Sequence, residues 1–419
     1  MGRMMWFGTL FLSACADDPE IDVGPVPTWS ADVAPLVVEH CARCHDGTGT
    51  GTVTLSTYEN VTAISALVDA VLAAGTMPPP AADLDCAPYE GDDGFVLDDE
   101  ERQVFQAWLG GGMPEGDVGT SALKIEAPHL SRIDAELFID APYVPDFDGI
   151  NEYRCFQMDN PADVELYITG LEPIISNPLI SHHTVLFLDN NGTSDGLITD
   201  PASRSWKCPE VIPDSEWLLL HAWAPGNNPV EFPDGMGMKV QPDWKPVLQM
   251  HYFKPNSSVD GVADQPGYRF TVADSVTKEI FFFPFGPEGF TIPAGKTTHK
   301  EKIEYDVLDI MYGYPLNITL YGVFPHMHVL GKKYEAWGTD EDGENICISK
   351  ADSYDFSNQP TYMFSDPITV PSGGTLGYSC TWDNSEGNPD QINDPVIDVE
   401  WGEDSEMEMC YGLFYVSYL

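Results

Sequence analysis

The chain has 419 residues, which is too long for one compact core and predicts two or three domains. Its 43% hydrophobic and 11% aromatic residues are typical of folded proteins and argue against wholesale disorder. With 19 Lys and Arg against 67 Asp and Glu, the formal net charge is −48. Such a field repels phosphate backbones, so no nucleic-acid partner is expected, and the acidity is interpreted as a solubility feature.

Residues 1–15 have the pattern of an export signal. Arg3 precedes an apolar stretch, residues 4–12, that is shorter than the roughly 20 residues needed to span a bilayer. The stretch ends at Leu12-Ser13-Ala14-Cys15, which resembles the bacterial lipobox, so we expect cleavage before Cys15 and lipidation of this residue. An ordinary signal with an incidental cysteine is the alternative. The expected product is an exported lipoprotein, tethered by an acidic linker over residues 16–28 to a bacterial membrane and facing the periplasm or the cell surface.

Residues 29–118 predict a small all-α domain. Ser30 is a candidate N-cap for a first helix ahead of Val33 and Leu36. A later helix is expected to open at Asp98-Asp99-Glu100-Glu101, in a capping-box arrangement, and to stop at Gly110-Gly111-Gly112. Both helices are short, and no β pattern interrupts them.

The motif Cys41-Ala42-Arg43-Cys44-His45 lies in this predicted domain and has the C-x-x-C-H pattern of covalent haem c attachment. Thioethers from Cys41 and Cys44 would fix the porphyrin, and His45 would be the proximal iron ligand. A disulfide between the two cysteines is the alternative interpretation. In an exported chain the pattern favours one covalently attached haem c.

The distal haem ligand is expected to be Met77, because the prolines after it would hold its loop across the haem face. Met113 is the rival candidate. His40, directly before the motif, is expected to be a surface residue. The Met77 segment and the later helix resemble the methionine loop and closing helix of small class I cytochromes c.

From residue 127 onwards the pattern changes to short β-type runs, such as residues 135–139, 164–168 and 183–188, separated by Pro, Gly, Asn and Asp. Strands without intervening helices predict β-sandwiches. About 290 residues are more than one sandwich usually holds. A seam near residues 272–275 therefore predicts two all-β, jelly-roll-like sandwiches, over residues 127–273 and 274–419.

Histidines are concentrated in this β region. His326 and His328 would share one face of a strand and could chelate one ion. His182 and His183 are adjacent and would point to opposite faces, so joint ligation needs a strand end or a bulge there. His251 lies in a separate β-type run.

Four short motifs recur in the order found in one family: Ser181-His182-His183-Thr184, Leu248-Gln249-Met250-His251-Tyr252, His326-Met327-His328-Val329-Leu330-Gly331-Lys332 and Glu408-Met409-Cys410. They resemble the copper type II, ascorbate-dependent monooxygenases, the group of peptidylglycine α-hydroxylating monooxygenase and dopamine β-monooxygenase. The resemblance spans roughly residues 127–419.

This resemblance implies two copper ions. The implied ligands of an electron-storing copper are His182, His183 and His251. The implied ligands of the copper at which O2 and substrate meet are His326, His328 and Met409. A soft thioether favours Cu(I) and argues against zinc, the competing metal. Hydroxylating a C–H bond with O2 consumes two electrons, and one copper ion supplies only one. The electron-storing copper would supply the other electron.

The family also implies which thiols pair. The expected disulfides join Cys155 to Cys208 and Cys380 to Cys410. Cys86 and Cys347 are left over, either as a further bond or as free thiols.

Two positions depart from the peptide-amidating members, which bind a glycine carboxylate with an arginine two residues before the His-x-His motif and a tyrosine four residues after the methionine. Phe324 and Leu413 stand here, and a buried carboxylate would find no partner. We therefore expect a small apolar or aromatic substrate, hydroxylated with electrons that a redox protein or small reductant supplies through the haem. The alternatives are a haem-bearing electron-transfer lipoprotein whose sandwiches bind copper or a partner without catalysis, and a lectin-like adhesion module that binds no copper.

Overall fold

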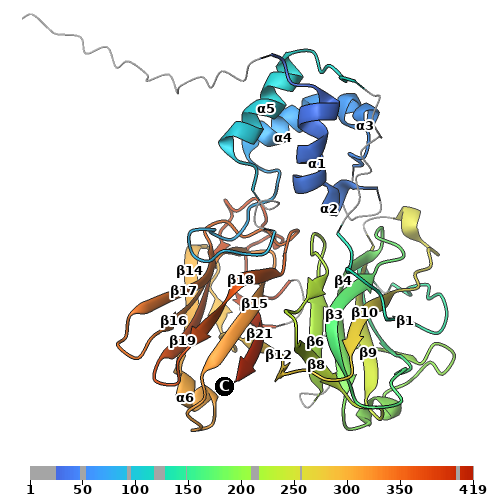
Figure 1. Ribbon diagram of the computed structural model, residues 1–419, viewed down its shortest axis with the longest axis vertical. Helices are drawn as coiled ribbons and strands as arrows, with labels where there is room; N and C mark the ends of the chain where they lie inside the picture. Colours follow the sequence, from blue (N-terminus) through green and yellow to red (C-terminus); the bar gives the residue numbers. More distant parts are fainter. Residues whose placement is uncertain are drawn as a thin grey trace, which may run out of the picture.

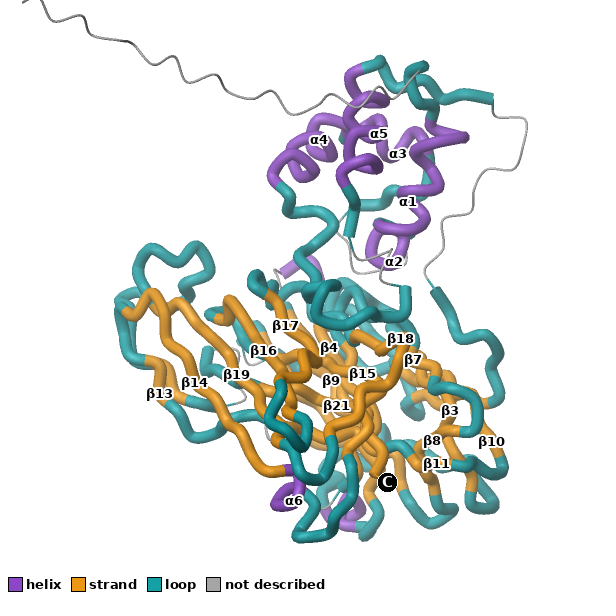
Figure 2. Tube along the Cα trace, turned by 60° about the vertical axis from the view of Figure 1, so that its left-hand side comes forward, coloured by secondary structure: helices purple, strands orange, loops and turns teal. Residues whose placement is uncertain are grey.

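The computed structural model describes residues 25–47, 53–91, 96–117, 128–147, 149–208, 217–254, 257–402 and 406–418. The expected signal peptide and Cys15 lie outside these residues. A helical unit lies above two β-rich bodies placed side by side (Figure 1), and most of the helix is confined to that unit (Figure 2). Within the described ranges, no helix is both long enough and apolar enough to cross a membrane.

The helical unit is built on a core that contains Val33, Phe105 and Trp108. Its helices are η1 (Trp29–Val33), α1 (Ala34–His40), α2 (Ala42–His45), α3 (Tyr58–Ala63), α4 (Ser65–Ala74) and α5 (Asp99–Gly110). The predicted capping box of α5 is confirmed, because Asp98 N donates to Glu101 Oε2 at 2.9 Å and Glu101 N donates to Asp98 Oδ1 at 2.8 Å.

The predicted N-cap at Ser30 is wrong. The first helical turn, η1, begins at Trp29, and Thr28 stands at its N-cap position. Thr28 N donates to Asp32 Oδ2 at 2.7 Å, so a carboxylate inside the turn satisfies the first backbone donor. The helix therefore starts before Ser30 can act as its cap.

The segment between α4 and α5 leaves the helical unit and packs on the C-terminal body. Tyr89 is buried there, stacks on Phe364 and donates from its hydroxyl to Ser349 Oγ at 3.0 Å. A disulfide joins Cys86 to Cys347, 261 residues away. This part of the predicted domain over 29–118 therefore belongs to the core of the C-terminal sandwich.

The N-terminal body is a sandwich of two sheets. One has the order β1-β10-β3-β8-β11, with β7 beside β3, and the other has the order β5-β2-β9-β4-β6. Their strands are β1 (Ala135–Phe138), β2 (Asn151–Gln157), β3 (Leu166–Ile174), β4 (Ser181–Asp189), β5 (Ser205–Lys207), β6 (Leu218–Trp223), β7 (Val230–Glu231), β8 (Met236–Val240), β9 (Lys245–Phe253), β10 (Gly267–Ala273) and β11 (Lys278–Glu279). The three runs predicted as strands overlap β1, β3 and β4.

The C-terminal body is a second sandwich, of sheets β12-β21-β15-β18 and β14-β19-β16-β17, with a small sheet β13-β20. Its elements are β12 (Phe281–Phe285), β13 (Thr291–Ile292), β14 (Lys296–Asp306), α6 (Val307–Ile310), β15 (Ile318–His326), β16 (Gly331–Thr339), β17 (Asn345–Ala351), β18 (Tyr362–Val370), β19 (Thr375–Asn384), β20 (Val399–Glu400) and β21 (Tyr411–Tyr418). Because β11 pairs with β8 and β12 pairs with β21, the chain crosses between the sandwiches at Ile280, a few residues after the predicted seam.

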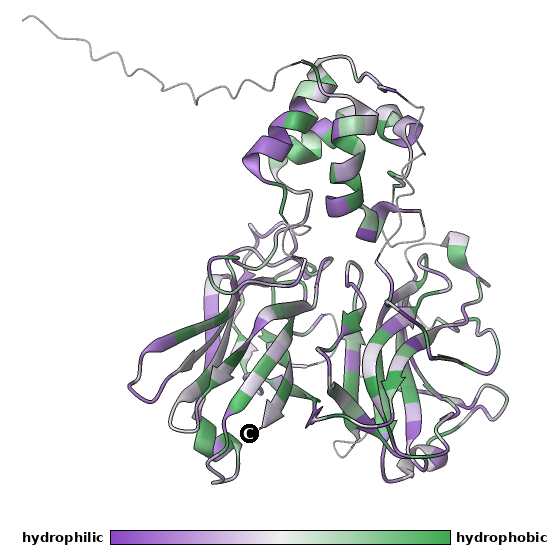
Figure 3. Cartoon of the chain, viewed as in Figure 1, coloured by the Kyte–Doolittle hydropathy of each residue, from purple (hydrophilic) through white to green (hydrophobic). Residues whose placement is uncertain are grey.

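The two sandwiches share apolar packing. Hydrophobic and hydrophilic residues alternate along many of the strands (Figure 3), as expected where one face of a sheet is buried. Tyr415 of the C-terminal sandwich lies in the core of the N-terminal one, and its ring stacks on Phe282 at 4.3 Å between centroids. This continuous core fixes the two sandwiches against each other.

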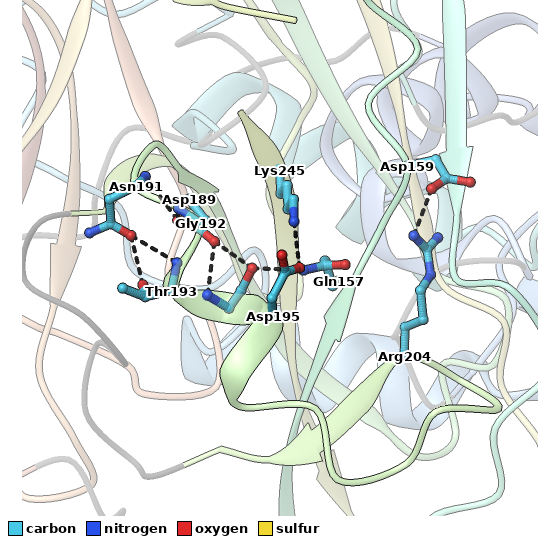
Figure 4. A network of polar contacts seen from close by, with 10 residues as sticks. Gln157, Asp159, Asp189, Asn191, Gly192, Thr193, Asp195, Arg204 and Lys245 are labelled. Atoms are coloured by element: carbon cyan, nitrogen blue, oxygen red, sulfur yellow. Dashed lines mark hydrogen bonds and ion pairs between the residues drawn. The ribbon is translucent and has the colours of Figure 1, made fainter. Parts of the chain in front are cut away.

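A polar network holds the far end of the sheet that carries the first histidines (Figure 4). The Asp189 carboxylate, at the end of β4, accepts hydrogen bonds from Asn191 N at 3.0 Å and Gly192 N at 2.7 Å. Asp195 accepts from Gln157 at the end of β2 and forms an ion pair with Lys245 at the start of β9. The network joins β2, β4 and β9, whose opposite ends form the first site below.

Candidate metal centres

The first histidine cluster is formed by a pair of antiparallel strands. His183 on β4 lies directly opposite His251 on β9. The register shifts between Ser181 and His183, so His182 is the extra residue of an irregularity in the pairing. The sequence required such a bulge for joint ligation, and the structure has one.

Three ring nitrogens converge in this cluster. His183 Nδ1 lies 3.2 Å from His182 Nδ1 and 3.2 Å from His251 Nδ1. With metal–imidazole bonds of about 2.0 Å, two ligands of one ion lie about 3.3 Å apart at near-tetrahedral angles. The three imidazoles therefore have the spacing of one metal site.

Neighbouring groups determine the state of these rings. His251 Nε2 donates to Asn151 Oδ1 at 2.9 Å, which leaves its Nδ1 unprotonated and facing the cluster. Tyr153 stacks on the His251 ring at 4.3 Å and 5°. Burial lowers the pKa of His183 and of His251 well below the usual value, and the neighbouring histidines lower both further. Neutral rings keep the lone pairs that a metal needs.

The second cluster lies at the end of β15. His326 is the last residue of that strand, and its ring centroid is 5.1 Å from that of His328. His326 Nδ1 donates to Gln359 Oε1 at 2.8 Å, and His328 Nδ1 donates to the Met407 carbonyl at 3.0 Å. Because an oxygen already occupies Nδ1 in both rings, Nε2 is the nitrogen that would bind a metal here, whereas the first cluster uses Nδ1.

Met409 lies beside this second cluster. It comes two residues before Tyr411, which is paired with His326 in the β15–β21 register. The neighbouring Glu408 carboxylate accepts from His328 N at 2.9 Å and from Leu330 N at 2.7 Å. Burial raises the pKa of Glu408 to about 8, and these donors oppose the rise. The Met409 segment is thus fastened directly to the His326–His328 segment.

Among the residues that the structure describes, the two clusters offer imidazoles and a thioether but no carboxylate ligand. That donor set suits copper and excludes magnesium or calcium, which need oxygen ligands. The residues present therefore fit the two copper ions that the sequence implied. The orienting groups Asn151, Gln359 and Glu408 were missed from sequence, and only Glu408 had a signal there, as part of a recognised motif.

Two family models match the chain. The N-terminal domain of the copper type II ascorbate-dependent monooxygenases matches residues 137–259, and the C-terminal domain of the same family matches residues 291–419. Together they cover more than half of the chain. The chain belongs to this family of copper monooxygenases.

Individual relatives agree with this membership. A human protein named DBH-like monooxygenase protein 2 is 26% identical over 297 residues, which cover 64% of this chain and 57% of that protein.

Among solved structures, the infectious bursal disease virus VP2 subviral particle has 10% identity and a TM-score of 0.16, covering 67% of this chain and 57% of that one. The tandem CBM22 domains of Paenibacillus barcinonensis Xyn10C have 12% identity and a TM-score of 0.15, covering 64% and 79%. Scores this low do not indicate a shared fold.

The positions that distinguish this chain from amidating monooxygenases of the family form an apolar pair. Phe324 on β15 lies opposite Leu413 on β21. Phe324 is 4% exposed, and its ring lies parallel to His326, with centroids 6.1 Å apart and 15° between planes. An apolar wall therefore stands beside the second copper site.

A cavity of about 580 Å³ lies between the helical unit and the two matched domains, and its volume is within the size range of cofactor sites. Cys41, Cys44, His45 and Met77 all line it. The two thiols form no disulfide with each other. His45 Nδ1 donates to the Val53 carbonyl at 2.8 Å, so Nε2 is free for an iron ion. The C-x-x-C-H residues therefore face one cavity with both thiols outside any disulfide.

Two further predictions concern this cavity. Met77 lines it, whereas Met113, the rival ligand, packs against the core of the helical unit. His40 was expected on the surface, and this is wrong. It is 3% exposed because α1 packs on α5, and its Nε2 lies 3.2 Å from Glu101 Oε1.

The opposite wall of the cavity belongs to the sandwiches. His182, a residue of the first copper cluster, lines it, and so does Asn358 of the C-terminal sandwich. Asn358 Nδ2 is buried without a hydrogen-bond partner. At Gly226 a Cβ atom would lie 2.7 Å from Asn358 Oδ1 and 3.5 Å from Cys44 Sγ, so only glycine fits where the three segments meet. The cavity therefore reaches the copper region directly.

The disulfides match the implied pairs. Cys155 is bonded to Cys208, and Cys380 is bonded to Cys410. The latter bond lies directly after Met409. The two cysteines left open by the sequence, Cys86 and Cys347, form the third bond.

Proposed function

We propose that this chain hydroxylates a C–H bond of a small apolar or aromatic molecule with O2, using two copper ions and electrons delivered through a covalently attached haem c. In the balanced reaction the substrate and O2 take up two electrons and two protons to give an alcohol and water. Residues 29–118, apart from the part around Tyr89 that packs in the C-terminal sandwich, act as a cytochrome c-like domain, and residues 127–273 and 274–419 act as the copper domains.

The observation that carries this proposal is the arrangement of ring nitrogens. Three Nδ1 atoms converge in the first cluster, and in the second, beside Met409, both Nδ1 atoms are bonded to oxygens, which assigns metal binding to Nε2. Copper bound in these sites would supply one-electron redox chemistry and O2 binding. The different ligand sets support different tasks, electron storage at the first site and reaction with O2 at the second.

The chain's own residues hold these ligands in place. Asn151 and Gln359 accept hydrogen bonds from the ring nitrogens that face away from the metals, which fixes each ring's tautomer and orientation. Glu408 accepts from the backbone of His328, so the methionine and histidine segments keep one spacing. Ligands held in advance need no reorganisation when the substrate reacts.

The substrate class rests on the apolar pair beside the second site. A carboxylate placed against Phe324 and Leu413 would lose its hydration without gaining a cation. An aromatic or aliphatic group would instead bury its surface against the Phe324 ring, which lies parallel to His326.

The haem is proposed as the built-in electron donor. Cys41 and Cys44 would attach it, His45 and Met77 would ligate its iron, and the cavity that would hold it extends to His182. An external redox protein or small reductant would reduce the haem. Export, with a lipid anchor at Cys15, is part of the same proposal, and three disulfides are typical of an oxidising compartment.

The test is oxygen uptake by the copper-loaded protein with ascorbate, across a panel of phenylalkyl and aliphatic molecules, with ¹⁸O2 incorporation measured by mass spectrometry. We expect at least one panel member to gain one ¹⁸O atom per O2 consumed. Met409→Leu should lower turnover at least about tenfold. The matched control Met311→Leu, in the C-terminal core, should not.

A copper-replete protein that consumes no O2 would support the electron-transfer alternative. Preferred hydroxylation of glycine-extended peptides would show that the substrate class is wrong. A Cys41→Ser/Cys44→Ser variant tests the donor, because it should lose turnover with a redox protein as reductant. Unchanged turnover there would mean that the haem has another task.

A further inference from the structure

A tight turn between β17 and β18 contacts all three proposed metal regions. Asn358 N donates to the Asp355 carbonyl at 3.0 Å, and Ser357 N donates to Asp355 Oδ1 at 2.9 Å. Phe356 and Ser357 are the central residues of the turn. Asp355, Ser357 and Asn358 line the haem cavity, while Phe356 faces the copper ligands.

The Phe356 ring contacts one ligand of each copper site. Its centroid lies 5.7 Å from that of His182, with 34° between the planes. It also lies 6.1 Å from that of His328, in an edge-on arrangement at 76°. One side chain therefore fills the space between a histidine of the N-terminal sandwich and a histidine of the C-terminal sandwich.

The backbone around this ring is held in place from both sandwiches. Gln359 Nε2 donates to the Phe356 carbonyl at 2.8 Å, while the same side chain accepts from His326. Asn227, from the N-terminal sandwich, donates to the Gln359 carbonyl at 2.7 Å. The ring position is thus fixed relative to ligands of both sites.

We propose that Phe356 is a positioning residue for electron transfer between the two copper sites. Electrons tunnel faster through packed atoms than across a solvent-filled gap of equal width, and this ring supplies the packed contact from His182 to His328. A copper ion held at the first site would be oxidised from Cu(I) to Cu(II), and one held at the second site would be reduced from Cu(II) to Cu(I), so no other reactant is needed. The inference rests on the proposed function.

The test injects one electron per molecule into the oxidised, copper-loaded holoprotein without O2, by pulse radiolysis. The haem absorbance reports when the electron leaves the haem, and freeze-quenched EPR reports which Cu(II) signal disappears. Reference spectra come from His183→Ala and His328→Ala, which each lack one site. In Phe356→Leu the loss of the second-site signal should slow by at least about tenfold, while the haem bands and copper content stay unchanged.

Two control variants are needed. One tests whether the aromatic ring itself matters, and the other tests whether removing any ring near His182 has the same effect. Phe356→Tyr keeps an aromatic ring and should keep the wild-type rate. Phe253→Leu removes a ring that contacts His182 at 6.0 Å, and it should leave the step between the copper sites unchanged. Wild-type kinetics in Phe356→Leu would overturn the inference and leave the proposed function standing. An electron that never leaves the wild-type haem would contradict the proposed function, and this inference with it.

Discussion

Asn151 and Gln359 decide which nitrogen His251 and His326 present to the proposed copper ions. Neither is a ligand, and each touches one cluster only. Asn151→Leu should weaken copper binding at the first site about 10–100-fold and leave the second unchanged, because the His251 tautomer is no longer fixed. Gln359→Leu should weaken copper binding at the second site and leave binding at the first site unchanged. Chelator competition checks both affinities, and equal effects of the two variants on both sites would contradict the assignment.

His221 is a buried histidine outside both copper sites. Burial lowers its pKa to about 3, and its Nδ1 lies 3.0 Å from the Tyr268 hydroxyl. Because the folded-state pKa lies below the unfolded value, the unfolded chain binds a proton more readily as the pH falls below about 6.5. Stability should therefore decrease as the pH falls from 6.5 towards 3, by roughly 2 kcal/mol at pH 5 from this group.

The variant His221→Gln cannot take up that proton. Its urea midpoint should change less between pH 7 and pH 5 than that of the wild type. Identical acid dependence in wild type and His221→Gln would show that another group is responsible.

At the scale of elements, local patterns predicted local structure well. The capping box of α5, the strands β1, β3 and β4, and the need for a bulge at His182 all follow from neighbouring residues. The docking of the segment before α5 could not be predicted from neighbouring residues, because Tyr89 packs against residues about 275 positions later in the chain. Such a contact leaves no periodic signal in either segment.

That docking gives a prediction for the disulfide between Cys86 and Cys347. A Cys86→Ser/Cys347→Ser variant should lose about 2–4 kcal/mol of stability. It should also expose the segment between α4 and α5 to limited proteolysis. The control, Cys155→Ser/Cys208→Ser, removes a bond within the N-terminal sandwich and should leave that segment protected. Equal cleavage in the two variants would contradict the proposed role of the bond in docking.

At the scale of the molecule, the three proposed metal regions meet where the helical unit and both sandwiches join. The six proposed copper ligands could be named from the sequence because the family motifs contain them. Their closeness to the proposed haem cavity could not be predicted from the sequence. His182 and Cys44 line one cavity only because separate domains pack against each other. Gly226 and Asn358, which make that approach possible, belong to no motif.

The most direct test of the central claim is the metal content of the purified, copper-loaded protein, with haem measured by its absorbance and copper by mass spectrometry. The proposed sites predict two copper ions and one haem for each chain. They predict one copper in His183→Ala, one in His328→Ala and full haem in both. Two copper ions retained in either variant, or a wild type that binds fewer than two, would contradict the assignment of the two histidine clusters.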